Sequence, residues 1–248
     1  MTLYGAVRRV HIWVGLLLGV QILLWMASGV VMSWYSIGFI RGEHTAPVAA
    51  PLELNPETYA SPGGVIAQLG AVHSLELRTL DGRPVYETKG PLGPALFDAR
   101  SGDPVLIDEA LVNRLARSQY VGEGALAVVE MVDDPGIEYR GAGPLPVWRA
   151  QFDDKINTRL YISPATGEIV RRRNDAWLFY DFFWMLHIMD YTDRSDFNSP
   201  LLKTASAAGL IFSASGLAML FFRSSRKIIA SDVRRLTGRR ANQDSAAS

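Results

Sequence analysis

The sequence predicts an α+β protein in which two or three transmembrane helices carry a domain outside the cytoplasm. Three observations lead to this fold class. Residues 10–40 contain no Asp, Glu, Lys or Arg, and residues 201–222 contain only one charge, Lys203. Each stretch exceeds the ~20 apolar residues that a helix needs to cross ~30 Å of hydrocarbon. Residues 42–174, between them, alternate apolar and polar positions as half-buried strands do, with turn residues between the strands.

The first apolar stretch is expected to remain in the mature protein as an anchor. A cleaved signal has an apolar core of only ~7–15 residues, about half the length found here. The stretch contains Trp34 and Tyr35 near its end, an aromatic pair typical of the headgroup level. Arg8 and Arg9 precede it, and basic residues favour the cytoplasmic side. We therefore expect the N-terminus in the cytoplasm.

The number of spans depends on residues 177–191, a short stretch rich in Phe, Trp and Tyr. As a helix it would reach only ~22 Å at 1.5 Å per residue, and it contains Asp181 and Asp190. If it lies in the interface, the chain has two spans and both basic ends face the cytoplasm. If it spans, the tail, with seven Lys or Arg in residues 223–248, falls outside. The two-span model is favoured, and both stay open.

The amino-acid composition limits the partners and the kinds of metal site that can be expected. The net charge is zero, so nucleic acid is not expected as a partner. The basic tail would attract anionic lipid headgroups, which makes the lipid bilayer the first expected partner. The chain has no cysteine, which excludes disulfides, thioether-attached haem and thiolate-bound clusters. Metal chemistry would therefore need His, carboxylate, Tyr or Met. Motif searches show no HExxH, GxSxG, P-loop or GxGxxG, so no catalytic residues are assigned.

The domain between the spans contains an internal repeat. Helices are expected at residues 62–70 and 109–120, and strands at 74–80, 84–88, 95–98, 104–107, 125–132, 146–152, 159–163 and 168–170. Pro84-Val-Tyr86 matches Pro146-Val-Trp148 at an offset of 62, and the hairpin at 96–103 matches that at 161–168 at an offset of 65. Each unit reads as a helix, a strand and a hairpin closed by Ser/Thr-Gly-Asp/Glu. Units of this size are too small for a large core alone, so the two are expected to pack together.

Four segments carry a family resemblance. The hairpin Tyr161-Ile-Ser-Pro-Ala-Thr-Gly-Glu-Ile-Val170 resembles the PepSY domain. The segments 10–19, 41–44 and 186–191 (Val-His-Ile-Trp-Val-Gly-Leu-Leu-Leu-Gly, Arg-Gly-Glu-His and Leu-His-Ile-Met-Asp-Tyr) resemble membrane-anchored PepSY proteins. That group includes iron-regulated inner-membrane proteins and haem-containing ferric-siderophore reductases. The resemblance implies a multi-pass protein of the bacterial inner (cytoplasmic) membrane, with its soluble domain outside the cytoplasm.

Two functions from different classes follow from the resemblance. The first is electron transfer by b-type haem, linked to iron or siderophore reduction. The second is a non-enzymatic binding or regulatory module that acts on a membrane or periplasmic protein partner, such as a protease. The expected segments are a start and first span (1–41), a tandem PepSY-like domain (42–174), an aromatic interfacial or short membrane helix (175–198), a last span (199–223) and a basic cytoplasmic tail (224–248).

Three histidines near the membrane boundaries are the candidate haem and metal ligands: His11, His44 and His187. A b-type haem needs only imidazole nitrogens on steady helices. His11 is followed at i+4 and i+8 by Gly15 and Gly19, which would leave room for a flat macrocycle. The alternative is an interfacial histidine above a helix-packing face of small residues. A matching small stripe is expected on the last span at Ala205, Gly209, Ser213 and Gly216.

His187 stands among aromatic residues that would wall a porphyrin or, alternatively, form a headgroup belt. His44 lies just outside the first span, where it would meet His187 or be held by a nearby carboxylate. In the two-span model His11 and His187 lie ~30 Å apart, so an inner haem would need a second copy of the chain, a homodimer. In the three-span model the two pair on one iron. His73 is expected to be a surface or packing residue. Gln21 and Ser28, the polar residues of the first span on one face with Trp25, are expected to contact another helix.

Overall fold

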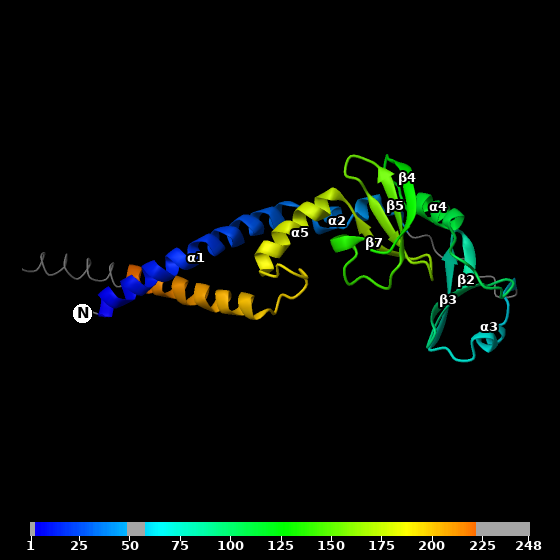
Figure 1. Cartoon of the computed structure of the whole chain (residues 1–248), viewed down its shortest axis with the longest axis horizontal. Coiled ribbons are helices and arrows are strands. Elements are labelled where there is room, and N and C mark those ends of the chain that lie inside the picture. Colours follow the sequence, from blue (N-terminus) through cyan, green and yellow to red (C-terminus); the bar gives the residue numbers. More distant parts are fainter. Residues whose placement is uncertain (1–2, 49–57, 222–248) are drawn as a thin grey trace, which may run out of the picture. The chain divides into compact units, whose positions relative to one another are not determined.

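The computed structural model describes residues 3–48 and 58–221. It is a mixed α+β structure with two long apolar helices and two antiparallel sheets (Figure 1). The chain divides into two compact units. The helical unit contains residues up to Val31 and from Phe183 onward, and the α+β unit is Met32–Phe182. The basic tail expected at 224–248 lies outside the described residues.

Two helices are long and apolar enough to cross a membrane: Gly5–Trp34, within α1 (Leu3–Trp34), and the last helix, Pro200–Phe221. The remaining apolar segment forms α5 (Asp175–Ile188), whose 14 residues fall short of a full span. In the helical unit, partly buried positions recur every three or four residues along the last helix, at 205, 209, 212 and 216. That spacing gives each helix one packed face and one open apolar face.

A loop ordered by Asp190 separates α5 from the last helix. Its carboxylate accepts backbone N–H groups from Thr192, Asp193, Ser195 and Asp196 at 3.0–3.2 Å. These bonds, led by that from Asp196, hold the pKa of Asp190 well below its usual range. The Asp190 side chain therefore acts as an internal cap that fixes the reversal of the chain, and it stays ionised at neutral pH.

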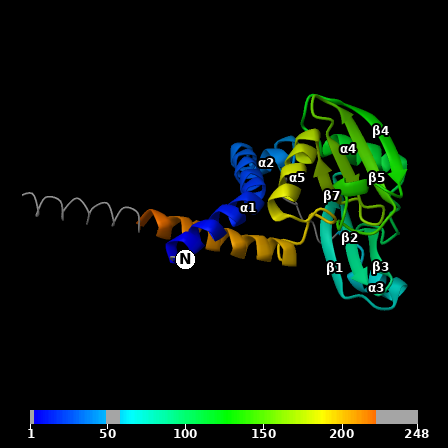
Figure 2. The same cartoon turned by 60° about the vertical axis from the view of Figure 1, so that its left-hand side comes forward.

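The α+β unit contains two meander sheets, ordered β1-β2-β3 and β4-β5-β6-β7. The first is formed by β1 (Ser74–Leu80), β2 (Arg83–Gly90) and β3 (Gly93–Asp98). The second is formed by β4 (Ala125–Val132), β5 (Val147–Asp153), β6 (Arg159–Ile162) and β7 (Ile169–Arg173). The helical segments are α2 (Ile37–Ile40), η1 (Glu43–Thr45), α3 (Pro62–Leu69), α4 (Glu109–Ser118) and η3 (Gly136–Glu138). Both views show α3 beside the first sheet and α4 beside the second (Figures 1 and 2).

The two repeats share one hydrophobic core, as expected from their size. Leu80, Val85 and Leu96 of the first sheet belong to the same buried cluster as Phe152 and Leu160 of the second. The apolar face of α4 completes that cluster, with Leu111, Val112, Leu115 and Ala116 buried. Asp108 caps α4 by accepting the backbone N–H of Leu111 at 2.8 Å, which satisfies one donor of the first helical turn.

The order of elements repeats as helix and three strands, α3-β1-β2-β3 and α4-β4-β5-β6, followed by β7 in the second copy alone. The strand expected at residues 104–107 is wrong: Pro104 makes only an isolated bridge to Phe97. At the predicted offset of 65, Pro104 corresponds to Ile169, the first residue of β7. Proline has no N–H to donate to a ladder, so the first repeat stops where the second gains a strand.

The segment that enters the α+β unit and the segment that leaves it are bonded together. Asn174 is fully buried and donates from Nδ2 to the carbonyl of Phe39 at 3.3 Å. Its Oδ1 accepts the backbone N–H of Trp177 at 2.8 Å and so caps α5. Arg172 donates to Thr45, whose carbonyl also accepts the N–H of Val121. We call these contacts the entry–exit clamp.

Candidate functional site

His11 is used in packing between α1 and the last helix. Its Nδ1 lies 2.7 Å from the hydroxyl of Ser215, and its ring stacks on Phe212 with 4.2 Å between centroids. The space beside Gly15 holds the Phe212 ring, because a Cβ at Gly15 would lie 2.7 Å from that ring. The other edge of the imidazole faces Gly216, where a Cβ would lie 3.1 Å from Cε1.

These contacts do not fit His11 as a haem ligand. A porphyrin needs open space beside a free imidazole nitrogen. The Nε2 of His11 makes no hydrogen bond to the described residues, but Phe212 covers one face of the ring and Gly216 lies against the edge that carries Cε1. Gly19 differs, because nothing lies within 4 Å of a Cβ built there. The small-residue interpretation therefore describes the Gly15 face. The expected stripe is corrected at Ser213, which is exposed, while Phe212 and Ser215 face α1.

His187 joins α5 to α1. Its Nδ1 lies 2.9 Å from the hydroxyl of Ser28, which also donates to the Leu24 carbonyl. Trp25 Nε1 donates to the His187 carbonyl at 2.9 Å, and Gln21 Nε2 to that of Leu186 at 3.5 Å. The prediction that Gln21 and Ser28 make interhelical contacts is confirmed, and Trp25 on the same face makes one as well. The second ring nitrogen, Nε2, makes no hydrogen bond to any described residue.

Within the helical unit, His11 and His187 are not brought together. His11 and the His187 partner Ser28 lie ~25 Å apart along α1 at 1.5 Å per residue, so the two imidazoles cannot share one iron. His44 is exposed in the α+β unit and stacks on Phe39 at 4.9 Å. His73 is exposed at the start of β1, as expected for a surface residue. Within residues 3–48 and 58–221, no group of three or more His, Asp or Glu could hold a metal ion.

A matched pair of glycines tests the packing around His11. Gly15→Ala should destabilise the helical unit by about 1–3 kcal/mol, because the new Cβ forces Phe212 off its stack with His11. Gly19→Ala makes the same chemical change in open space and should be neutral or slightly stabilising, since alanine favours helix. Thermal unfolding of the full chain in detergent measures both. Equal losses would contradict this description of the packing, because they would show that Gly19 is contacted as closely as Gly15.

A basic groove along β7 in the α+β unit was missed by the sequence analysis. It encloses about 560 Å³, and its lining includes Arg41, Glu43, Arg171, Arg172, Arg173 and Trp177. The Arg173 guanidinium carbon lies 4.2 Å from the centre of the Trp177 ring. Burial, with the charge of Arg171 beside it, lowers the pKa of Arg173 to about 10, so this side chain is still a cation at neutral pH.

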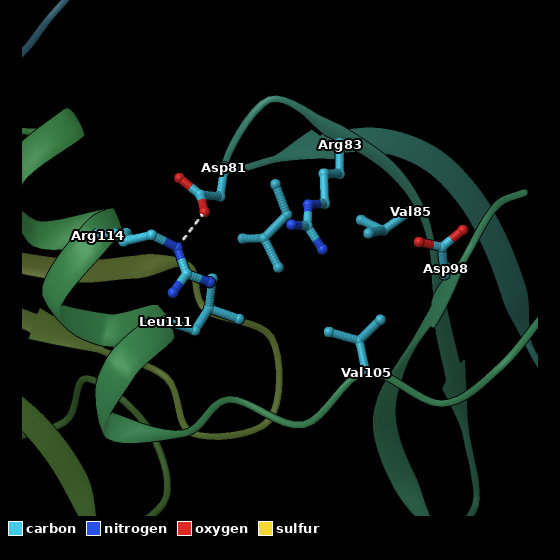
Figure 3. A pocket seen from close by; sticks show the side chains of 8 residues that line it. Asp81, Arg83, Val85, Asp98, Val105, Leu111 and Arg114 are labelled. Atoms are coloured by element: carbon cyan, nitrogen blue, oxygen red, sulfur yellow. Dashed lines mark hydrogen bonds and ion pairs between the residues drawn. The ribbon is translucent and has the colours of Figure 1, made fainter.

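Two other concavities in the α+β unit are smaller than this groove. One encloses only about 60 Å³ between β2 and α4 (Figure 3). There Asp81 and Arg114 point toward each other and form an ion pair at 2.7 Å, above the apolar side chains of Val105 and Leu111. The other encloses about 340 Å³ beside Tyr139 and the turn at Ser163. The first has room for little more than water.

Comparison with known proteins adds no assignment: no family model, no curated protein and no solved structure matches the chain.

Proposed function

We propose that the chain is an integral protein of the bacterial cytoplasmic membrane that holds a tandem PepSY-type domain at the outer face. There it acts as a non-enzymatic binding module for a partner. The N-terminus and the basic tail lie in the cytoplasm, and α5 lies at the membrane surface rather than across it. Both basic ends then face the same side, as the positive-inside tendency favours.

The entry–exit clamp is the observation that carries this proposal. It holds the residues that follow α1 against those that precede α5, through Asn174 with Phe39 and Arg172 with Thr45. A domain inserted between two spans needs both of its connections on one face, because both must return to the same membrane surface. The buried Ile40 and Asn174 make that junction a fixed part of the domain rather than a loose linker.

The PepSY assignment is supported by the repeated order of one helix and three antiparallel strands, closed by the turns at Ser101-Gly102 and Thr166-Gly167. The binding role is supported over haem electron transfer by the histidines. His11 and His187 each bond a serine hydroxyl of a neighbouring helix, which is how polar groups join helices in a membrane, at ~1 kcal/mol each. Haem electron transfer is the second candidate, supported by the Nε2 of His187, which makes no hydrogen bond to the described residues.

The absence of cysteine allows a direct test of topology. Single cysteines at Glu123→Cys, exposed in the α+β unit, and at Ser248→Cys, in the tail, would be probed with a membrane-impermeant maleimide on spheroplasts. We expect labelling at position 123 in intact spheroplasts, and at position 248 only after permeabilisation. Labelling of the tail in intact spheroplasts would support three spans. A stoichiometric Soret band in the purified protein that is lost in His187→Ala would instead favour the haem function.

A further inference from the structure

The basic groove carries more positive charge than the surrounding protein neutralises. Four arginines and one glutamate line it. Among the described residues, Arg171, Arg172 and Arg173 have no carboxylate within ion-pair distance, whereas Arg159 on the neighbouring strand β6 pairs with Glu138 at 2.6 Å. Glu138 and Asp181 act on Arg173 only at longer range, and burial together with Arg171 outweighs them. Partly buried cations without a counter-charge are costly, and such clusters favour binding of an anion.

The hydrogen bonds of these arginines leave donors open. A guanidinium has five N–H donors. Arg171 uses one on the Val170 carbonyl, and Arg173 uses Nε and Nη1 on the carbonyls of Glu138 and Arg172. The remaining donors of Arg171 and Arg173 find no acceptor among the described residues. None of these nitrogens is both buried and unpaired, so the open donors reach the groove or solvent.

The groove is held in shape from both sides. Arg172 bonds Thr45 and the Gln119 carbonyl, and its stem passes over Gly42, where a Cβ would lie 2.9 Å from Arg172 Cγ. Gly42 also has φ +70°, a conformation that disfavours other residues. Arg173 is fixed by the Trp177 ring. Arg173, one of the two arginines with open donors, is thus positioned before any ligand arrives, which lowers the entropy cost of binding.

We propose that this groove binds a phosphate-bearing anion, with Arg171 and Arg173 donating to the phosphate oxygens. Planar guanidinium forks match phosphate geometry, and about 560 Å³ accommodates a headgroup larger than the bare ion. The phosphate would come from an anionic lipid headgroup or from a soluble phosphate. Arg41 directly follows the apolar run of residues 10–40, which places a lipid source within reach. Only this lipid source rests on the proposed membrane anchoring.

Calorimetry on the full chain in an uncharged detergent tests the groove with three soluble probes: inorganic phosphate, glycerophosphoglycerol and the zwitterionic glycerophosphocholine. We expect saturable binding of glycerophosphoglycerol that Arg171→Gln weakens about tenfold or more. The matched control Arg117→Gln, on the exposed side of α4, should change the affinity less than about twofold. Arg41→Gln is a second groove variant whose side chain makes no hydrogen bond to the described residues, and it should weaken binding severalfold.

A parallel measurement separates the two phosphate sources. If thermal stability in nanodiscs rises with phosphatidylglycerol over phosphatidylcholine, and Arg171→Gln removes the rise, the source is lipid. If only the soluble probes depend on Arg171, the source is a soluble phosphate. The proposal fails if no probe binds saturably, or if Arg171→Gln and Arg117→Gln change affinity equally. The calorimetry with soluble probes does not depend on how the chain is oriented in a membrane. Its result is therefore independent of the cysteine-labelling experiment.

Discussion

Replacing Glu138 with alanine should lower the free energy of unfolding of the α+β unit by about 2–4 kcal/mol. The variant loses the nearer of the two carboxylates that pair with Arg159 and the acceptor of the buried Tyr161 hydroxyl, while Asp175 still pairs with Arg159 at 3.0 Å. Arg159 is only 11% exposed and pairs with Glu138 at 2.6 Å. The buried Tyr161 hydroxyl donates to the same carboxylate at 2.6 Å, and burial and this bond raise the pKa of Tyr161. The Glu138 backbone carbonyl still accepts from Arg173 in the variant, so the change isolates the carboxylate.

Glu130→Ala is the matched control for Glu138→Ala. Glu130 pairs with Arg149 at 2.5 Å, but both side chains are solvent-accessible, 45% and 31% exposed. Exposed pairs contribute only about 0–1 kcal/mol, so this variant should be nearly neutral. Urea unfolding of the full chain in detergent, followed by circular dichroism, compares the two. Similar losses in both variants would show that burial does not set the strength of these pairs.

The sheets were predictable because their signals are local. Period-two alternation and the Gly-containing turns located the strands, and the aligned repeat identified β2 with β5 and β3 with β6. The same alignment sets Pro104 against Ile169, so the missing strand was visible as a proline in one repeat alone. The error at Ser213 has a geometric cause. Steps of four residues drift off a helix face with 3.6 residues per turn, and so the packed positions are 209, 212 and 216.

The sites were less predictable because their contacts are distant in sequence. The residues next to His11 do not indicate a contact with Ser215, and those next to His187 do not indicate one with Ser28. From the sequence alone, a histidine that is free to bind a ligand therefore cannot be distinguished from one engaged in packing. In the sequence, Arg171 to Arg173 are only a run of three basic residues before the aromatic segment. Alternation along a strand would split these residues between two faces. They line one groove because β7 is an edge strand of its sheet and has no strand on one side. Side chains from both faces of β7 can therefore border a groove along that free edge.

Asn174→Ala should destabilise the α+β unit by about 1.5–2.5 kcal/mol, since this buried side chain makes two separate hydrogen bonds. The variant loses the cap on Trp177, which costs about 1 kcal/mol, and the bond to the Phe39 carbonyl, which contributes about 0.5–1.5 kcal/mol. The Phe39 carbonyl still accepts the N–H of Gly42 at 3.0 Å. Hydrogen exchange of the full chain should then speed up at the first turn of α5 and at residues 39–45, two segments far apart in sequence.

Asn113→Ala is the control for this clamp variant. The Asn113 amide donates only to the Glu109 carbonyl on the open side of α4, and alanine is the better helix former, so stability should be unchanged or slightly raised. Faster exchange in α5 alone would mean that Asn174 is merely a cap. Faster exchange at both segments would mean that the connections to the two apolar regions are held as one piece, which is the property that the proposed anchoring requires.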